Sequence, residues 1–142
     1  MIKKIPKNLS PELMKVLMEM GHGDELVLAD GNYPAASNAQ RLIRCDGLTI
    51  PDLLKSLLEF FPTDSYVDTA FALMDVAQGD STVPVIWDTY KEIIGNAEVE
   101  NDRIEMMERQ AFYERGKLAY AIVATGEEAI YANLLIKKGI VK

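Results

Sequence analysis

The fold is organised around the stretch Met20-Gly21-His22-Gly23-Asp24-Glu25-Leu26-Val27-Leu28-Ala29-Asp30. It holds the only histidine of the chain, set between two glycines, and then a short apolar run that ends on a carboxylate. Four apolar residues bounded by charges are typical of a buried strand, so we expect a strand over residues 26–29. Asp30 then follows the strand, where α/β sheets hold their ligands. The Gly-His-Gly segment is equally compatible with a helix stop and a turn.

The composition is that of an ordinary globular domain. Of the 142 residues, 49% are hydrophobic and 26% are charged, so we expect one domain over residues 1–142 with a sizeable core. No apolar run approaches the length of a membrane span, and residues 1–6 lack the apolar segment of a secretory signal. Cys45 is the only cysteine, which excludes an internal disulfide and a cysteine-rich zinc site. Together these features favour a cytoplasmic protein without a membrane partner.

The net charge of −7 bears on the class of ligand. A protein that binds duplex nucleic acid usually presents a basic face, so we expect no nucleic-acid partner. A small neutral ligand such as a sugar is compatible with this charge.

Apolar spacing and turn residues predict alternating helices and strands. Ser10, Pro11 and Glu12 form a helix start, because serine caps and proline suits the first helical position. We expect helices over residues 11–20, 49–61, 84–94 and 110–118, and strands over residues 26–29, 41–44, 70–74, 120–124 and 131–136. Residues 103–107 fit either a strand or a helix, and we interpret them as a strand. The alternation predicts an α/β fold, a three-layer α/β/α single domain with a mixed, largely parallel sheet.

His22 is the first candidate for chemistry. Histidine exchanges protons near neutral pH, and the flanking glycines leave its ring uncrowded. We expect the adjacent Asp24 and Glu25 to raise its proton affinity, although both acids also suit a solvated strand entrance. One histidine and one cysteine are a poor supply of metal ligands, so no metal site is expected. Gly21 and Gly23 lack the third glycine and the preceding strand of a dinucleotide loop.

Two further pairs combine polar and aromatic side chains. Arg109 and Tyr113 are four residues apart on an expected helix, so they share a face and would place a fixed cation beside a phenol. The same pair suits a surface helix or an interface. Tyr131 and Asn133 are two residues apart on an expected strand and would project to the same side. An aromatic ring beside an amide suits a sugar, and it also suits an ordinary sheet edge.

Four blocks of the sequence, in order, resemble the L-fucose mutarotases and more distantly the D-ribose pyranases. They are Gly21-His22-Gly23-Asp24-Glu25 with Asp30 and Pro34; Arg44-Cys45-Asp46-Gly47-Leu48; Arg109-x-Ala111-Phe112-Tyr113-Glu114-Arg115; and Thr125-Gly126-Glu127 with Tyr131-Ala132-Asn133 and Lys137-Lys138-Gly139. The third block favours the fucose branch. The alanine of Tyr131-Ala132-Asn133 is usual in the ribose branch, and Gly31-Asn32-Tyr33 replaces an alanine-containing version.

The resemblance implies a cofactor-free isomerase that interconverts the α and β anomers of L-fucose or a related reducing monosaccharide. It also implies an α/β domain assembled into a ring-like homo-oligomer, often a decamer. By the same resemblance His22 matches the general acid and Tyr113 a catalytic partner. The substrate-binding positions that it implies are Asp30, Arg109, Tyr131 and Asn133. Two alternatives are a D-ribose pyranase, which interconverts pyranose and furanose, and a non-catalytic sugar-binding ring protein.

The length of the central strand constrains any shared pocket. A strand rises roughly 3.3 Å per residue, so His22 and Asp30 would lie near opposite ends of residues 26–29. They can meet only if the glycine loop folds back or if two chains contribute to one site. We expect the second arrangement, a pocket at a subunit boundary with His22 and the pair Tyr131 and Asn133 from different chains.

Overall fold

The structure, a computed structural model, describes residues 1–142 and contains one six-stranded sheet and five helices. The strands are β1 (Glu25–Ala29), β2 (Leu42–Cys45), β3 (Phe71–Met74), β4 (Ile104–Met107), β5 (Ala121–Thr125) and β6 (Leu134–Lys137). The helices are α1 (Pro11–Glu19), α2 (Ala35–Asn38), α3 (Ile50–Leu57), α4 (Ile86–Asn96) and α5 (Arg109–Leu118). No helix combines the length and the apolar character that crossing a bilayer requires.

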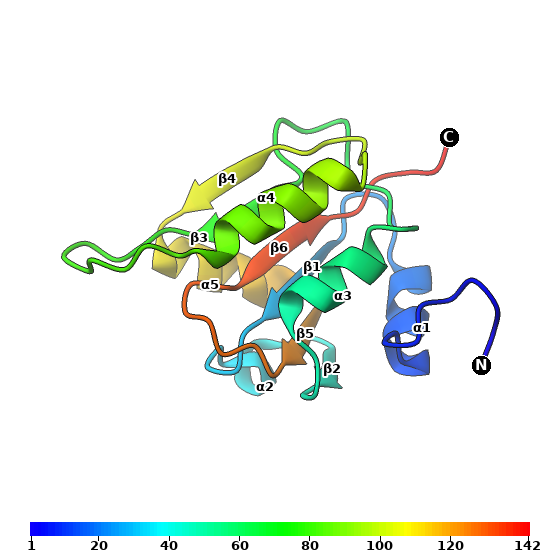
Figure 1. The fold of residues 1–142 in the computed structure, drawn as a ribbon, viewed down its shortest axis with the longest axis horizontal. Helices are drawn as coiled ribbons and strands as arrows, with labels where there is room; N and C mark the ends of the chain where they lie inside the picture. The colour runs from blue at the N-terminus through cyan, green and yellow to red at the C-terminus, as the bar shows by residue number, and fades with distance from the viewer.

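The sheet has the order β2-β5-β1-β6-β3-β4, with the predicted strand β1 near its centre (Figure 1). β1 pairs in parallel with β5 and antiparallel with β6. β6 is the one strand that runs against the others, because the β2–β5 and β3–β4 pairs are parallel too. The prediction of a mixed, largely parallel sheet is therefore confirmed.

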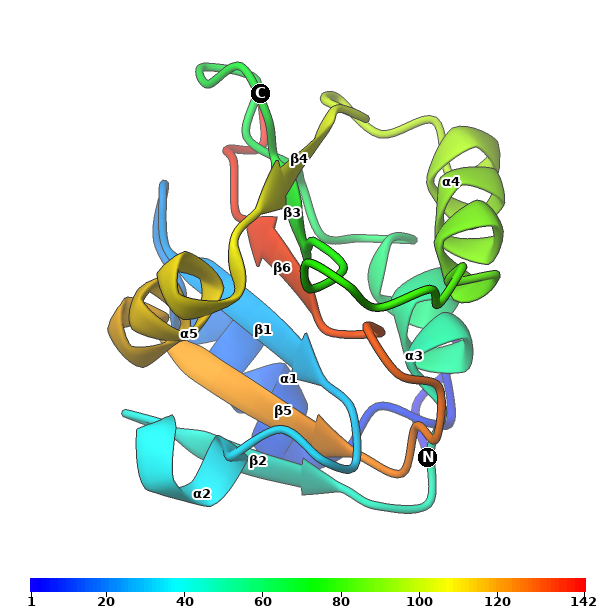
Figure 2. The same ribbon diagram turned by 90° about the vertical axis from the view of Figure 1, so that its left-hand side faces the viewer.

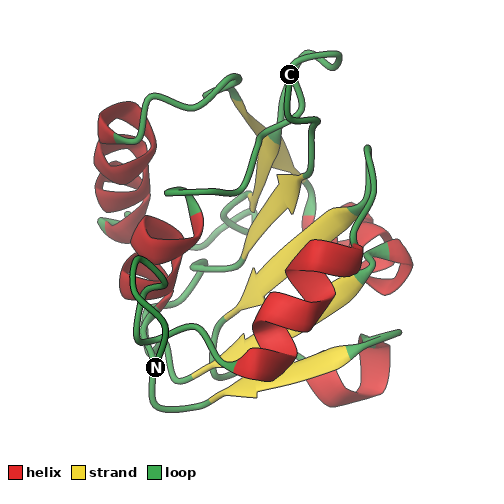
Figure 3. Cartoon of the chain, turned by 90° about the vertical axis from the view of Figure 1, so that its right-hand side faces the viewer, coloured by secondary structure: helices red, strands yellow, loops and turns green.

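Helices cover both faces of this sheet (Figure 2). Helices α1, α3 and α4 pack on one face over a cluster of 25 buried residues, and α2 and α5 pack on the other over a cluster of 11. The β1 side chains alternate between the two, since Leu26 and Leu28 belong to the larger cluster and Val27 to the smaller. Figure 3 shows α1 in front of the sheet, running in nearly the same direction as the strands. The predicted three-layer α/β/α class is confirmed.

Local sequence signals explain where the helices begin. The Ser10 hydroxyl accepts a hydrogen bond from Leu13 N at 3.1 Å, and Pro11 occupies the first helical turn of α1. Thr49 caps α3 in the same way, accepting from Asp52 N at 3.3 Å. Each cap contributes roughly 1 kcal/mol to helix stability. The expected strand over residues 103–107 is present as β4.

Four elements differ from the sequence prediction. β6 begins at Leu134 rather than at Tyr131, because Tyr131 has φ +58°, a left-handed conformation that an extended strand does not admit. A short helix, α2, forms where only a turn was expected. α3 ends at Leu57, four residues earlier than predicted, and α4 continues through Gly95 to Asn96. Apart from the additional helix α2, these are boundary errors, and the order of the predicted elements is unchanged.

Candidate active site

A cavity of about 300 Å³ lies beyond the carboxyl end of β1, beside the start of α5. Its lining consists of Asp30, Asn32, Tyr33, Met74, Ala77, Asp80, Arg109, Tyr113, Ile130, Tyr131 and Asn133. Five of the six predicted site residues are in this set, namely Asp30, Arg109, Tyr113, Tyr131 and Asn133. The sixth, His22, is not. The volume is at the lower end of the range for small-molecule sites.

Asp30 and Asn133 form the buried floor of the cavity. They are 7% and 4% exposed, and the Asp30 backbone N–H donates to Asn133 Oδ1 at 2.7 Å. The Asp30 carboxylate accepts from Asn32 N at 2.9 Å. Burial raises the pKa of Asp30, and the backbone N–H of Asn32 opposes this shift. A carboxylate in this setting can accept a proton or a hydrogen bond from a ligand hydroxyl.

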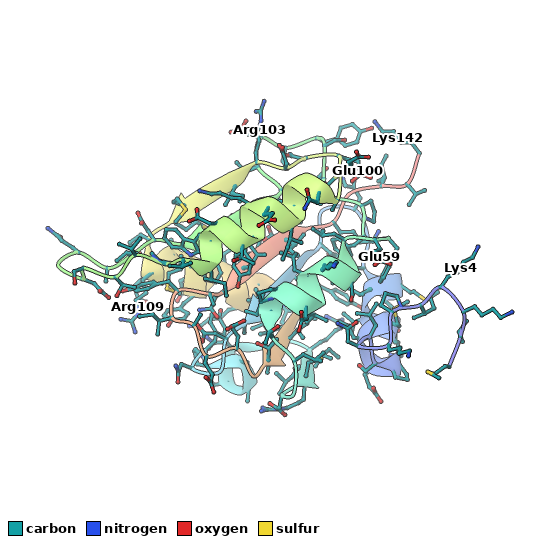
Figure 4. The ribbon with its side chains drawn as sticks, viewed as in Figure 1. Lys4, Glu59, Glu100, Arg103, Arg109 and Lys142 are labelled. Atoms are coloured by element: carbon teal, nitrogen blue, oxygen red, sulfur yellow. The ribbon has the colours of Figure 1, made fainter.

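Helix α5 supplies the cation and one phenol. Arg109 is its first residue, and the guanidinium carbon lies 5.5 Å from the centre of the Tyr113 ring. The predicted shared face is therefore present. Tyr113 also packs against Tyr33 with ring centres 5.3 Å apart. Figure 4 labels Arg109, which lies toward the end of the molecule where the loop after β3 extends.

Tyr131 adds a second phenol to the lining of the cavity. Its backbone oxygen accepts from Trp87 Nε1 at 2.7 Å, which fixes the segment before β6 against α4. Its hydroxyl donates to Asp80 Oδ2 at 2.5 Å. Tyr131 and Asn133 do line one cavity, but strand alternation is not the reason, since both precede β6. The expected strand geometry at this pair was wrong, and the left-handed turn at Tyr131 replaces it.

His22 lies at the opposite end of β1, in the loop after α1. Its Nε2 is 3.0 Å from Asp64 Oδ1, its ring centre is 5.3 Å from that of Tyr66, and its side chain is 44% exposed. The five residues of β1, at roughly 3.3 Å each, separate this loop from the cavity by roughly 16 Å. Within one chain, His22 therefore faces solvent away from the cavity.

The carboxylate at His22 is Asp64, a residue that the sequence prediction missed. The adjacent acids are engaged elsewhere, because Asp24 accepts from Gly21 N and Glu25 pairs with Arg115. The expectation that Asp24 and Glu25 act on His22 is therefore corrected. Asp64 is 2% exposed. Burial alone would raise the pKa of Asp64, but bonds from Tyr66 N and His22 lower it overall.

Close packing of three chain segments holds this pair. Gly23 has φ +86°, and its N–H donates to Lys138 O at 2.8 Å. Asp64 N donates to Lys137 O at 3.1 Å, so the segment that carries Asp64 is tied to the end of β6. A Cβ at Gly139 would collide with the Thr63 backbone, which explains the glycine there. No sequence signal near His22 points to Asp64, which is 42 residues away.

No other cavity described here is lined by more than one of the six predicted site residues. The largest, about 580 Å³, lies beside Phe60 and the C-terminal Val141 and contains none of them. No group of three or more histidine, cysteine, aspartate or glutamate side chains is placed to hold a metal ion.

A three-layer α/β/α domain with a polar cavity at the end of its central strand defines an α/β protein that binds a small polar ligand. The separate imidazole–carboxylate pair adds a group able to transfer protons. The chain matches the model of the RbsD/FucU transport protein family over residues 3–141, and it belongs to that family.

Relatives and solved structures agree with this assignment. The chain is 50% identical to the fucose mutarotase of Danio rerio over 147 residues, covering 99% of this chain and 94% of the relative. It superposes with a TM-score of 0.95 on the fucose mutarotase of Streptococcus pneumoniae, whose crystal structure contains L-fucose, at 56% identity over 99% of this chain and all of the other. Bacillus subtilis RbsD, complexed with D-ribose, shares the fold with a TM-score of 0.74 at 22% identity over 100% of both chains.

Proposed function

We propose that this chain is an L-fucose mutarotase, an isomerase that interconverts the α and β anomers of the free sugar. The observation that carries the proposal is the cavity, in which Asp30, Arg109, Tyr131 and Asn133 converge in a fold with a TM-score of 0.95 to a fucose mutarotase that holds L-fucose. The substrate-binding roles that the sequence resemblance implied for these four residues are part of the proposal.

The alternatives are less well supported. The likeness to RbsD, at 22% identity, concerns the fold alone. The stretch Phe112-Tyr113-Glu114-Arg115 also favours the fucose branch over a D-ribose pyranase. A non-catalytic sugar-binding protein remains the alternative of a different class, and it would not need His22 for binding.

The chemistry requires only proton transfer. The C1–O5 bond breaks as the ring oxygen gains a proton and the anomeric hydroxyl loses one, which leaves the open-chain aldehyde. Rotation about C1–C2 turns the other face of the carbonyl to the hydroxyl, and the reverse transfers close the ring. Positioned acid–base groups typically accelerate such steps by about 10²–10⁴-fold.

In this proposal His22 is the general acid, and Tyr113 is the second catalytic group. Asp64, with its lowered pKa, is an ionised acceptor and keeps the proton of His22 on Nε2. Nδ1 is then the nitrogen that exchanges a proton with the sugar. Arg109 and Asp30 offer a fixed cation and a carboxylate to the sugar hydroxyls, and neither changes its covalent state.

We further propose that two chains complete each site, because His22 and the cavity lie at opposite ends of β1. The partner's exposed imidazole would then cover the cavity. A ring-like homo-oligomer, a decamer as the resemblance implies, would repeat this contact. We place the protein in the cytoplasm, since its single cysteine is buried and unpaired.

Saturation-transfer NMR of reducing sugars tests the activity directly. Transfer between the α and β anomeric protons of L-fucose should rise with added protein and exceed the effect on D-ribose. His22→Ala should lower the enzyme-dependent rate by about 10²–10⁴-fold. Equal acceleration of pyranose–furanose exchange of D-ribose would favour the pyranase, and sugar binding with no change in exchange would favour the non-catalytic alternative.

A further inference from the structure

The loop between β3 and α4, residues 75–85, contributes to the lining of the cavity. Hydrogen bonds within the loop fix its conformation. Gly79 has φ +86°, a conformation that glycine adopts without strain. Directly after it, Asp80 Oδ1 accepts from Thr82 N at 2.9 Å and from Thr82 Oγ1 at 2.6 Å. Asp80 is therefore held by its own loop, and Figure 1 shows this loop extending beyond the sheet.

The other oxygen of Asp80 holds Tyr131. The Tyr131 hydroxyl donates to Asp80 Oδ2 at 2.5 Å and accepts from Ala77 N at 3.2 Å. A phenol has one proton and two acceptor lone pairs, so these two bonds leave one lone pair and no free proton. Both Asp80 and Tyr131 line the cavity.

Charge reinforces this arrangement. Asp80 raises the pKa of Tyr131, and bonds from Thr82 and Tyr131 lower the pKa of Asp80. The carboxylate therefore stays ionised and the phenol stays protonated at neutral pH. Arg109 lies close enough to act on the pKa of Tyr131 in the opposite sense, so the cavity presents a cation together with hydrogen-bond acceptors.

We propose that Asp80 is a positioning residue that turns Tyr131 into a hydrogen-bond acceptor, so that this part of the lining selects a sugar hydroxyl that donates. The inference rests on the proposed mutarotase function, because it assigns a specificity role within the same cavity. Asp80 acts through Tyr131, and the hydroxyl that is selected must donate to the Tyr131 oxygen.

Asp80→Asn inverts the polarity of this part of the lining. The Asn side chain is forced to keep Oδ1 on Thr82, because Thr82 N–H would otherwise lose its acceptor. Its Nδ2 then faces Tyr131 and donates, which frees the phenol proton to point into the cavity. Tyr131 would change from acceptor to donor without any change in the size of the side chain at position 80.

The experiment measures L-fucose anomer exchange with Asp80→Asn, and with Asp75→Asn as the matched control. Asp75 is in the same loop, but its carboxylate accepts only from Val76 N and it does not line the cavity. We expect Asp80→Asn to raise KM about tenfold or more, as for the loss of one good hydrogen bond, with a smaller change in kcat. Asp75→Asn should match the wild type. A KM for Asp80→Asn within about twofold of the control would overturn the inference.

A second readout does not depend on activity. In protein labelled with ¹³Cζ-tyrosine, Asp80→Asn should move the Tyr131 signal and let Tyr131 ionise at lower pH than in the wild type. Thr82→Val, which keeps the carboxylate that accepts from Tyr131, should change the Tyr131 titration less than Asp80→Asn does. If the wild type did not accelerate anomer exchange, the mutarotase proposal would be wrong. If the Tyr131 titration were unchanged in Asp80→Asn, the proposed positioning role of Asp80 would be wrong.

Discussion

The environment of Asp30 opposes the ionisation of its carboxyl group. It is 7% exposed at the end of β1, and burial raises its pKa above the ordinary value of 3.8. A carboxyl whose pKa rises on folding favours the folded state while it is protonated. That stability is present below pH 3.8 and is lost as the pH rises through the higher pKa of the folded state. The buried carboxylate thus lowers the free energy of unfolding at neutral pH. A residue that binds a ligand can carry such a loss of stability, because function and stability often conflict at the same position.

Asp30→Asn should therefore stabilise the protein at pH 7 by about 1 kcal/mol or more, because it removes a buried charge. The same change should reduce L-fucose exchange. Urea unfolding of both proteins across pH gives the test, and the stability difference should shrink to nothing below about pH 3.8. Asp46→Asn is the control, since Asp46 is exposed and Arg44 lowers its pKa, so no stabilisation is expected there.

Asp64 is predicted to act on His22 alone. Its Oδ1 is occupied by His22 and by Tyr66 N, so Asp64→Asn should lower kcat roughly 10-fold to 100-fold and leave KM for L-fucose nearly unchanged. Asp68→Asn, four residues along, alters only an exposed ion pair with Arg103 and serves as the control. Equal kcat for the two variants would remove Asp64 from the mechanism.

Among the elements, α5 matters most to the site because it presents Arg109 and Tyr113. Arg115 ties this helix to the sheet, with bonds to Glu25 on β1 at 2.6 Å and to Glu105 on β4 at 3.1 Å. The face of α5 that packs on the sheet side is also closely packed, against Tyr33. Tyr33 lies beneath α5 with a buried hydroxyl that has no hydrogen-bond partner, and a Cβ at Gly116 would collide with that hydroxyl.

This packing predicts a coupled pair of substitutions. Gly116→Ala should destabilise the protein by roughly 1–3 kcal/mol, because the new methyl overpacks the Tyr33 hydroxyl. Tyr33→Phe should be neutral or stabilising, since it removes an unsatisfied polar atom. The double variant should recover much of the lost stability in thermal unfolding. Additive effects of the two changes would show that the collision does not limit the approach of α5.

At the scale of the whole molecule, the length of β1 separates the cavity from the His22–Asp64 pair. The cavity opens where β1 ends, and His22 with Asp64 lies where β1 begins. In Figure 4, Arg109 and Lys142 are labelled toward opposite ends of the molecule, and Lys142 lies over Tyr66, the neighbour of His22. A functional site that uses both ends needs a second chain.

Mixing protomers tests that requirement. When His22→Ala and Asn133→Ala proteins are unfolded and refolded together, about one quarter of the sites should combine an intact imidazole with an intact cavity if protomers mix randomly. Anomer exchange should recover accordingly. His22→Ala mixed with Asp64→Asn, which damages the His22–Asp64 pair in both proteins, should recover none. Mixed assemblies no more active than their parents would contradict a site shared between chains.

Local signals in the sequence determined the elements and the class of fold. The short apolar run of residues 26–29 indicated a buried strand, Ser10 and Thr49 marked helix starts, and the spacing of Arg109 and Tyr113 indicated a shared helix face. Together with the family resemblance, these signals pointed to the six candidate residues. These features depend on neighbours a few residues away, so the order of residues is sufficient to predict them.

Only the tertiary structure decided which of those residues meet. It brought Asp64 to His22 across 42 residues and Asp80 to Tyr131 across 51, and neither partner carries a local signal. It also replaced the expected strand at Tyr131 with a left-handed turn, because Trp87 and Asp80 hold that residue from both ends. Such contacts depend on how the sheet and helices pack, and no short-range periodicity encodes that packing.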